Sequence, residues 1–210
     1  MDEKKGADTA KRIAATDPSD LKTLVDAPVH CLYVGVTMTG KTTLARLHAR
    51  LLAQNKYDVI VYDPVGTETA GGGWPEEATV FDDERKFFDH VKSAQDAYVF
   101  VDEAPDVFNL GKPHNHWILR RGRHQGLYVR AVSQRPTMIA PNARTQCAIG
   151  YVFRMAPEDA YEVFADFGHA RATARESTEE LDEGDFVVIE SGRPAIAVFN
   201  VFDLIGRKRQ

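Results

Sequence analysis

Short apolar runs alternate with amphipathic stretches along most of this sequence. Five runs are rich in β-branched and aromatic residues without polar alternation, the pattern of strands buried on both faces. The clearest stretch between them, residues 41–54, places leucines at helical spacing among good helix formers. This alternation predicts an α/β fold with a mainly parallel central sheet between helix layers. The expected strands are His30–Val36, Tyr57–Tyr62, Ala97–Glu103, Leu127–Ser133 and Cys147–Phe153.

Three further helices and a hairpin complete the expected elements. The helices are Asp82–Ser93, Glu158–Phe167 and Arg171–Leu181. Near the end of the chain, the turn signal Ser191-Gly192-Arg193-Pro194 separates two β-type runs, Phe186–Ile189 and Ala195–Phe202. We therefore expect a C-terminal antiparallel hairpin at the edge of the sheet.

Length and composition favour one domain. A chain of 210 residues, 43% of them hydrophobic, can bury a single sizeable core. We expect a polar N-terminal extension over residues 1–27, a single α/β domain over 28–205 and a basic tail over 206–210.

No apolar stretch has the length of a membrane span, and the first residues lack the apolar core of a signal peptide, which predicts a cytosolic protein. Cys31 and Cys147 lack metal-ligand spacing and are expected as reduced, buried thiols.

The charge is unevenly distributed. The net charge is −5, yet residues 107–157 contain no Asp or Glu. A basic block inside an acidic chain favours a local anionic partner such as phosphate or nucleic acid. The alternative is a solvated basic face with some structural ion pairs. The block contains Lys112, Arg120, Arg121, Arg123, Arg130, Arg135, Arg144 and Arg154.

Residues 35–42 fit the phosphate-binding pattern G-x-x-x-x-G-K-[ST] completely, between a predicted strand and a predicted helix. The glycines let the backbone curl so that several N–H groups face one phosphate chain at the start of the helix. Lys41 is expected to reach the β- and γ-phosphates, and Thr42 to place its hydroxyl on Mg²⁺. The predicted nucleotide-binding residues are Gly35, Val36, Thr37, Met38, Thr39, Gly40, Lys41, Thr42 and Thr43.

Two further strand ends carry candidate catalytic groups. The strand Ala97–Glu103 ends in two acids, which is the Walker B pattern. Asp102 is predicted to hold Mg²⁺ through water, and Glu103 to orient and deprotonate the attacking water. Gln134, at the end of the next predicted strand, has an amide able to contact both the γ-phosphate and that water.

These motifs together resemble the FtsK–HerA ATPases, which are ring-forming DNA pumps. The resemblance covers about residues 28–190. It rests on the two Walker motifs and on residues 122–136, GRHQGLYVRAVSQRP. This segment has the order of elements found in the family: an arginine (Arg123), a loop with glycine, a strand and a Gln-Arg-Pro at the end of the strand. The strand entry near Gly184-Asp185 is also similar. At 210 residues, the chain is most similar to the small genome-packaging ATPases of membrane-containing double-stranded DNA viruses, in the poxvirus-type branch.

The resemblance implies a RecA-like P-loop NTPase fold with ATP and Mg²⁺ as cofactors. It also implies a homo-oligomeric ring, hexamer or pentamer, acting on double-stranded DNA. Within such a ring Arg123 would be an arginine finger, donated across a subunit boundary. Capsid or membrane vertex proteins would be further partners. The expected location is the cytoplasm of the infected host cell or the packaging vertex of the virion.

Other functions remain open from the sequence. A P-loop kinase of nucleotides or small metabolites could use Arg120, Arg121 and Arg123 in a lid, although Glu103 beside Asp102 favours hydrolysis. An ATP-dependent assembly switch is the third hypothesis. Trp74 and the segment Lys112–Trp117 are candidates for lining a pore, but exposed connector loops are the simpler interpretation.

Overall fold

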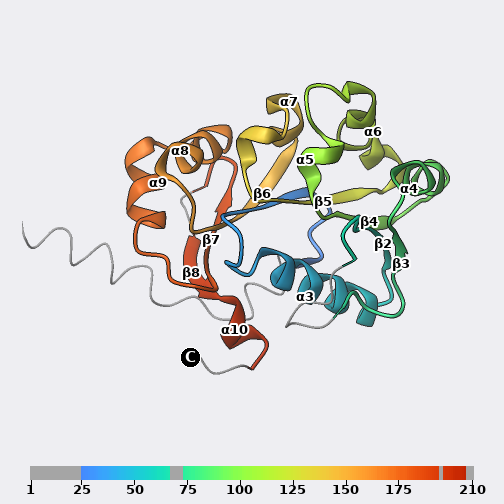
Figure 1. The fold of residues 1–210 in the computed structure, drawn as a ribbon, viewed down its shortest axis with the longest axis horizontal. Coiled ribbons are helices and arrows are strands. Elements are labelled where there is room, and N and C mark those ends of the chain that lie inside the picture. Colours follow the sequence, from blue (N-terminus) through green and yellow to red (C-terminus); the bar gives the residue numbers. More distant parts are fainter. Residues whose placement is uncertain (1–24, 67–72, 194–195, 207–210) are drawn as a thin grey trace, which may run out of the picture.

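The computed structural model describes residues 25–66, 73–193 and 196–206 (Figure 1). Its centre is an eight-stranded sheet in the order β3-β2-β4-β5-β1-β6-β7-β8. The strands from β1 to β6 pair in parallel, whereas β7 and β8 are antiparallel. The strands are β1 (His30–Val34), β2 (Asp58–Tyr62), β3 (Thr79–Phe81), β4 (Ala97–Val101), β5 (Tyr128–Ser133), β6 (Cys147–Phe153), β7 (Asp185–Glu190) and β8 (Ile196–Asn200).

The expected α/β architecture is confirmed, with two differences in the strands. The short strand β3 was not predicted, because its three residues are exposed or half-buried and show no buried pattern. The hairpin forms at the sheet edge, but the prediction that its second strand extends to Phe202 is wrong. Asn200 ends β8, since its side chain accepts hydrogen bonds from the backbone of Phe202 and Asp203 and starts a short helix.

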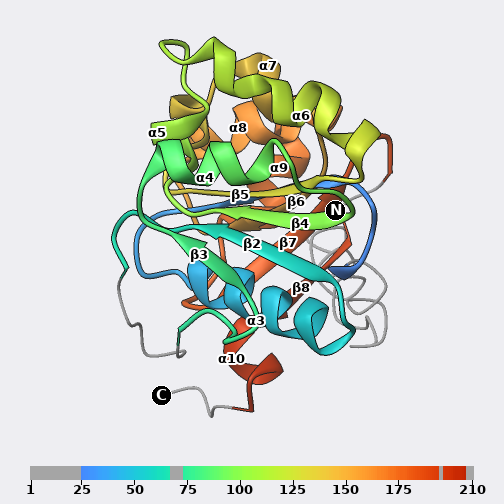
Figure 2. The ribbon, with the colours of Figure 1, turned by 90° about the vertical axis from the view of Figure 1, so that its right-hand side faces the viewer.

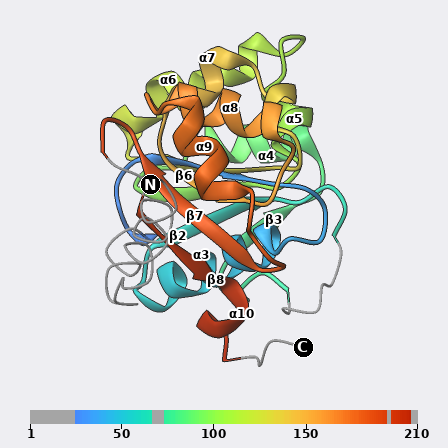
Figure 3. The same cartoon turned by 90° about the vertical axis from the view of Figure 1, so that its left-hand side faces the viewer.

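Helices cover both faces of the sheet unequally. Helices α3 and α10 lie on one face, and the helices from α4 to α9 lie on the other (Figures 2 and 3). The α-helices are α3 (Lys41–Gln54), α4 (Glu84–Val91), α5 (Ala104–Val107), α6 (Trp117–Arg121), α7 (Pro141–Arg144), α8 (Pro157–Asp166), α9 (Arg171–Thr178) and α10 (Val201–Leu204). The 3₁₀ helices are η1 (Pro113–His116), η2 (Gly122–Gln125) and η3 (Pro136–Met138). No described helix is long and apolar enough to cross a membrane.

Strand β1 shows how one sequence run fills two cores. Cys31 and Tyr33 pack into the cluster that includes helix α3, whereas Leu32 and Val34 pack into the cluster below the other helices. All four side chains are fully buried. Successive strand residues point to opposite faces, so a strand between two helix layers must be apolar throughout. Cys31 and Cys147 are buried free thiols, as predicted.

The sheet topology creates the site. Strand β1 lies between β5 and β6, and the loops after β1, β4 and β5 leave the same carboxyl edge. In open α/β sheets, ligands bind at that edge, where the strand order reverses. The predicted P-loop, Walker B residues and Gln134 all follow these three strands.

Candidate nucleotide site

The P-loop curls tightly between β1 and α3, and its glycines have no room for a side chain. A Cβ on Gly35 would lie 2.6 Å from Phe153 Cβ. Gly40, at the start of α3, has φ 104°, and its Cβ would lie 2.8 Å from a methyl group of Val201. The two glycines of the motif are therefore required by close packing against the end of β6 and the start of α10.

Lys41 is folded back into this loop. Its side chain is only 6% exposed, and Nζ donates a hydrogen bond of 2.7 Å to the carbonyl of Val36. Thr39 Oγ1 donates to the same carbonyl at 2.8 Å. Burial lowers the pKa of Lys41 to about 8, and the carboxylates of Asp102 and Glu103 oppose this shift. A partly desolvated ammonium inside a curl of backbone N–H groups suits a phosphate chain.

Asp102 follows β4 and faces the start of α3. Its Oδ1 lies 3.5 Å from Thr42 Oγ1 and accepts a hydrogen bond of 3.2 Å from the backbone N–H of Glu103. Burial, together with the nearby carboxylates of Asp63 and Glu103, raises the pKa of Asp102 to about 6.

Mg²⁺ prefers carboxylate and hydroxyl oxygens and retains several waters, so Thr42 and Asp102 fit it. In the described ranges, no group of three or more His, Cys, Asp or Glu side chains could hold a metal alone. A magnesium ion here would take its remaining ligands from nucleotide phosphates and water.

Gln134 joins the P-loop to Glu103. Its amide Nε2 donates to Glu103 Oε1 at 3.1 Å, and its Oε1 accepts from Thr37 Oγ1 at 2.8 Å. Glu103 itself has φ 55° and ψ 47°, a left-handed conformation that costs a non-glycine residue about 1–2 kcal/mol. Backbone strain of this kind is common at functional sites. Three strand ends predicted separately from the sequence therefore meet in one hydrogen-bonded chain.

The loop that carries Gln134 is anchored by Arg144, which the sequence analysis named only as a member of the basic block. Arg144 is 3% exposed and donates to Asp166 at 2.6 Å and to Glu162 at 3.0 Å, both on α8. It also donates to the carbonyls of Pro136 and Ile139, at 3.1 Å each. The only sequence pattern that pointed to this contact was the i,i+4 spacing of Glu162 and Asp166, which puts both acids on one face of a helix.

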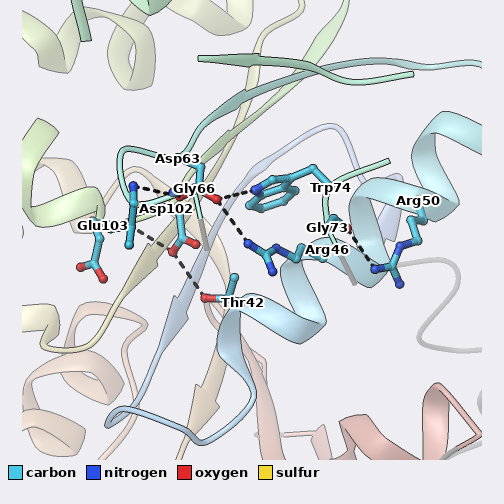
Figure 4. Close-up of polar contacts among 10 residues, drawn as sticks. Thr42, Arg46, Arg50, Asp63, Gly66, Gly73, Trp74, Asp102 and Glu103 are labelled. Carbon is cyan, nitrogen blue, oxygen red and sulfur yellow. Dashed lines mark hydrogen bonds and ion pairs between the residues drawn. The ribbon is translucent and has the colours of Figure 1, made fainter. Parts of the chain in front are cut away.

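A second buried ion pair, also missed, lies beside Asp102. Arg46 on α3 contacts Asp63 after β2 at 3.3 Å, and both side chains are nearly inaccessible (Figure 4). Seventeen residues separate them, so no local pattern identified them as partners.

Arg123 lies far from the other predicted site residues of its own chain. It is exposed in η2, before β5 begins, whereas Gln134 follows the end of that strand. At about 3.3 Å per residue, a six-residue strand separates its ends by about 17–20 Å. The Arg123 charge contributes to lowering the pKa of His30, at the start of β1, to about 4, after burial and Arg130. Arg123 therefore lies at the edge of the sheet opposite the P-loop.

The basic block divides into internal and exposed groups. Arg130 and Arg144 are buried, and Lys112 and Arg135 form ion pairs with Glu84 and Asp159. The exposed members without an ion pair among the described residues are Arg120, Arg121, Arg123 and Arg154.

The pore candidates have internal contacts. The Trp74 ring packs 5.6 Å from that of Phe100 and donates to Asp63. In the second candidate segment, Asn115 and His116 are buried. These contacts favour the interpretation of both segments as connectors.

No protein-family model and no curated protein matches this sequence. Solved structures do match. The genome packaging NTPase B204 from Sulfolobus turreted icosahedral virus 2, in complex with sulfate, has a TM-score of 0.67 at 20% identity, over 82% of this chain and 97% of that one. The chain has the fold of a genome-packaging NTPase.

Two other solved structures share this fold at lower sequence identity. The pCW3 conjugation coupling protein TcpA, with ATPγS, gives a TM-score of 0.64 at 14% identity, over 84% of this chain and 62% of that one. The Type VII secretion ATPase EccC of Thermomonospora curvata gives 0.56 at 16% identity, over 81% of this chain and 25% of its cytoplasmic domain. The expected RecA-like P-loop architecture is thus confirmed, whereas the poxvirus-type branch stays a prediction.

Proposed function

We propose that this protein is an ATP-hydrolysing motor that translocates double-stranded DNA and packages a viral genome into a preformed capsid. The observation that carries the proposal is the hydrogen-bonded chain from Thr37 through Gln134 to Glu103. It connects the phosphate loop to a carboxylate able to activate water, an arrangement suited to hydrolysis rather than to transfer onto a second substrate. The fold shared with B204, described as a genome packaging NTPase, supports the packaging role.

Each residue has a defined task in this reaction. The P-loop amides and Lys41 bind the β- and γ-phosphates, and Thr42 and Asp102 hold Mg²⁺. The metal neutralises charge on the phosphate oxygens when it is bound. Glu103 accepts a proton from water as the water oxygen bonds to the γ-phosphorus and the bond to the β–γ bridging oxygen breaks. Gln134 orients that water against the γ-phosphate.

Arg123 completes the site from a neighbouring subunit in this proposal. An exposed arginine at the opposite edge of the sheet from its own P-loop cannot act on its own nucleotide, but suits a head-to-tail ring. The ring would be a hexamer or a pentamer around duplex DNA. It would work in the cytoplasm of the infected cell or at the packaging vertex, in contact with capsid or membrane vertex proteins.

The ATPase rate with and without duplex DNA, measured at several salt concentrations, tests the motor. Duplex DNA is expected to raise the rate, and the stimulation should weaken as salt rises, because contacts with the phosphate backbone release counterions. A kinase or an assembly switch predicts no stimulation. The same rate with and without DNA at every salt concentration would refute the DNA motor.

Mixing two inactive variants tests the ring. The Lys41→Ala variant keeps Arg123, and the Arg123→Ala variant keeps an intact P-loop. In a mixed ring, some interfaces therefore combine the intact P-loop of one subunit with the intact Arg123 of its neighbour. Partial recovery of hydrolysis is expected, and Arg85→Ala, which removes an exposed arginine on α4, is the matched control. If labelled subunits co-assemble without recovery and Arg123→Ala lowers wild-type activity in linear proportion, Arg123 acts within its own subunit.

A further inference from the structure

Helices α8 and α9 form a groove on the surface of the molecule. The two helices lie side by side on the face of the sheet that also carries α4 to α7 (Figures 1 and 3). The groove has a volume of about 500 Å³, in the range of clefts that bind ligands. It is lined by Tyr161 on α8 and by Arg171, Ala172, Arg175 and Glu179 on or directly after α9. None of these residues belongs to the candidate nucleotide site.

The walls of this α8–α9 groove are held by the core. Tyr161 is half-buried and packs against the larger apolar cluster. Its helix is tied to the loop after β5 by the buried Arg144, which donates to Glu162 and Asp166. On α9, Ala174 is fully buried, so the arginines of this helix lie on its outward side. The groove is therefore pre-formed, which lowers the entropy cost of binding a ligand.

Arg171 is arranged to receive a carboxylate. Its guanidinium lies over the Tyr161 ring, 5.4 Å from the ring centre. A cation–π contact of this kind restrains the side chain but uses none of the N–H donors. Arg171 forms no ion pair with any residue that the structure describes. Its planar fork of donors is thus available to a planar anion.

Arg175 already holds a carboxylate of this protein. Its Nε donates to Glu179 Oε2 at 3.0 Å, and its Nη2 donates to Glu179 Oε1 at 3.3 Å, which is a bidentate pair. The two side chains are 66% and 58% exposed, so the pair is weak and exchangeable. A carboxylate from another chain offers Arg175 the same two acceptors.

The spacing of the two arginines matches an extended peptide. Arg171 and Arg175 are four residues apart, so they share one face of α9 and are separated by about 6 Å along its axis. Side chains at alternate positions of an extended chain are separated by about 6.6 Å and point the same way. Two acidic side chains with one residue between them can therefore bind both arginines.

The surroundings favour a short acidic peptide over nucleic acid. Glu179 lines the groove itself, and Glu180, Asp182 and Glu183 follow it in the chain. Duplex DNA is bound by positive surfaces that contact many phosphates, whereas these two arginines have carboxylates around them. Such carboxylates repel a long polyanion but admit a segment with few charges.

We propose that the α8–α9 groove docks an extended acidic segment of a partner protein, whose alternate carboxylates bind Arg171 and Arg175. Glu179 is an internal competitor that the segment displaces from Arg175. The docking site goes beyond the proposed function and does not depend on it, because no groove residue binds or hydrolyses the nucleotide.

Fluorescence anisotropy with two labelled peptides of equal charge tests the docking on the full-length protein. The peptides are Gly-Ser-Glu-Ser-Glu-Ser-Gly, with alternate glutamates, and Gly-Ser-Glu-Glu-Ser-Ser-Gly, with adjacent ones. The first should bind more tightly, since adjacent side chains of an extended chain point in opposite directions. No binding, or equal binding of the two peptides, overturns the proposal. This comparison needs no substitution, so it is decisive even if a variant does not fold.

Substitutions then locate the binding. Arg171→Gln and Arg175→Gln should each weaken binding of the alternating peptide about tenfold. Arg85→Gln, which removes an exposed arginine on α4, is the matched control and should leave it unchanged. Tyr161→Leu should also weaken binding, whereas Tyr161→Phe keeps the ring under Arg171 and should retain it. Equal losses in the Arg85 and Arg171 variants would show attraction to overall charge and refute a site in the groove.

Glu179→Gln tests the internal competitor, because it releases Arg175 and should tighten binding of the alternating peptide. Glu180→Gln removes the same charge at the next residue, which does not line the groove, and should have a smaller effect. Equal changes in the two variants would contradict the displacement of Glu179.

A short duplex DNA, used as a competitor, separates a peptide site from a nucleic-acid site. The duplex should not displace the alternating peptide, and Arg171→Gln should leave any effect of DNA on the ATPase rate unchanged. Displacement by DNA, together with a lost DNA effect in Arg171→Gln, assigns the groove to nucleic acid and overturns the peptide proposal. A wild-type protein without DNA-stimulated hydrolysis refutes the proposed motor but leaves the peptide measurements to decide the docking site.

Discussion

Replacing Arg144 with methionine removes the buried cation that anchors the loop after β5. Four hydrogen bonds are lost together: two to the carboxylates of Asp166 and Glu162, and two to the carbonyls of Pro136 and Ile139. The Asp166 side chain is only 14% exposed, so it would remain as a poorly solvated negative charge. Methionine keeps much of the side-chain volume, which limits the contribution of a cavity.

The expected loss of stability follows from these contacts. Removing one partner of a buried ion pair costs about 3–5 kcal/mol, and the two carbonyls that lose their donor are included in that range. Since the whole domain is stabilised by about 5–15 kcal/mol, Arg144→Met should remove a large part of its stability. Urea unfolding should show a lower midpoint with an unchanged slope.

A matched variant separates this effect from the general loss of a charge. Glu162→Gln weakens a contact of the same guanidinium, but the Glu162 side chain is 56% exposed and the cost should be about 0–1 kcal/mol. The ATPase rate of Arg144→Met should also fall more than its ATP affinity, because the loop it releases carries Gln134. Equal losses of stability in the two variants, or a loss below about 1 kcal/mol in Arg144→Met, would refute the reasoning.

Four other outcomes are expected. Lys41→Ala should abolish hydrolysis and weaken ATP binding, whereas Glu103→Gln should bind ATP in a filter assay without cleaving it, because an amide cannot accept the proton. His30 is neutral in the folded protein, with its pKa lowered from 6.5 to about 4, so about 3 kcal/mol of stability should be lost as the pH falls from 6.5 to 4. In His30→Gln, denaturation at several pH values should show a smaller loss. Gly184→Ala should lower the melting temperature by several degrees, since φ is +83° and a Cβ would lie 2.5 Å from the Phe202 ring.

The sequence was most informative where function and local structure coincide. The five buried strands have no polar alternation, and the P-loop, Asp102 and Gln134 each follow one of them directly. Parallel strands bring their carboxyl ends to one edge, so residues far apart in the chain could be assigned to one site. The structure adds the hydrogen bonds that join Thr37, Gln134 and Glu103.

The sequence was least informative where tertiary contacts determine the structure. The short helices between β4 and β5 have too few turns to produce a helical period. The intervening loop is held by Glu84, which bonds to both Lys112 and Asn115 across about thirty residues. The helix predicted over residues 171–181 ends at Thr178. Buried ion pairs are hidden for the same reason, because a charged residue in the sequence does not reveal a distant partner.

Those buried pairs change what the basic block implies. Arg130 donates to three backbone carbonyls before β1, and Arg144 serves the loop after β5, so neither is available to an anionic partner. Three of the exposed arginines, at positions 120, 121 and 123, lie together in α6 and η2, at the sheet edge opposite the P-loop. The fourth, Arg154, follows β6, and its carbonyl accepts from Val36 in the P-loop. Within the basic block, the positive charge that internal ion pairs do not use therefore lies where the proposed ring brings one subunit against the nucleotide of the next.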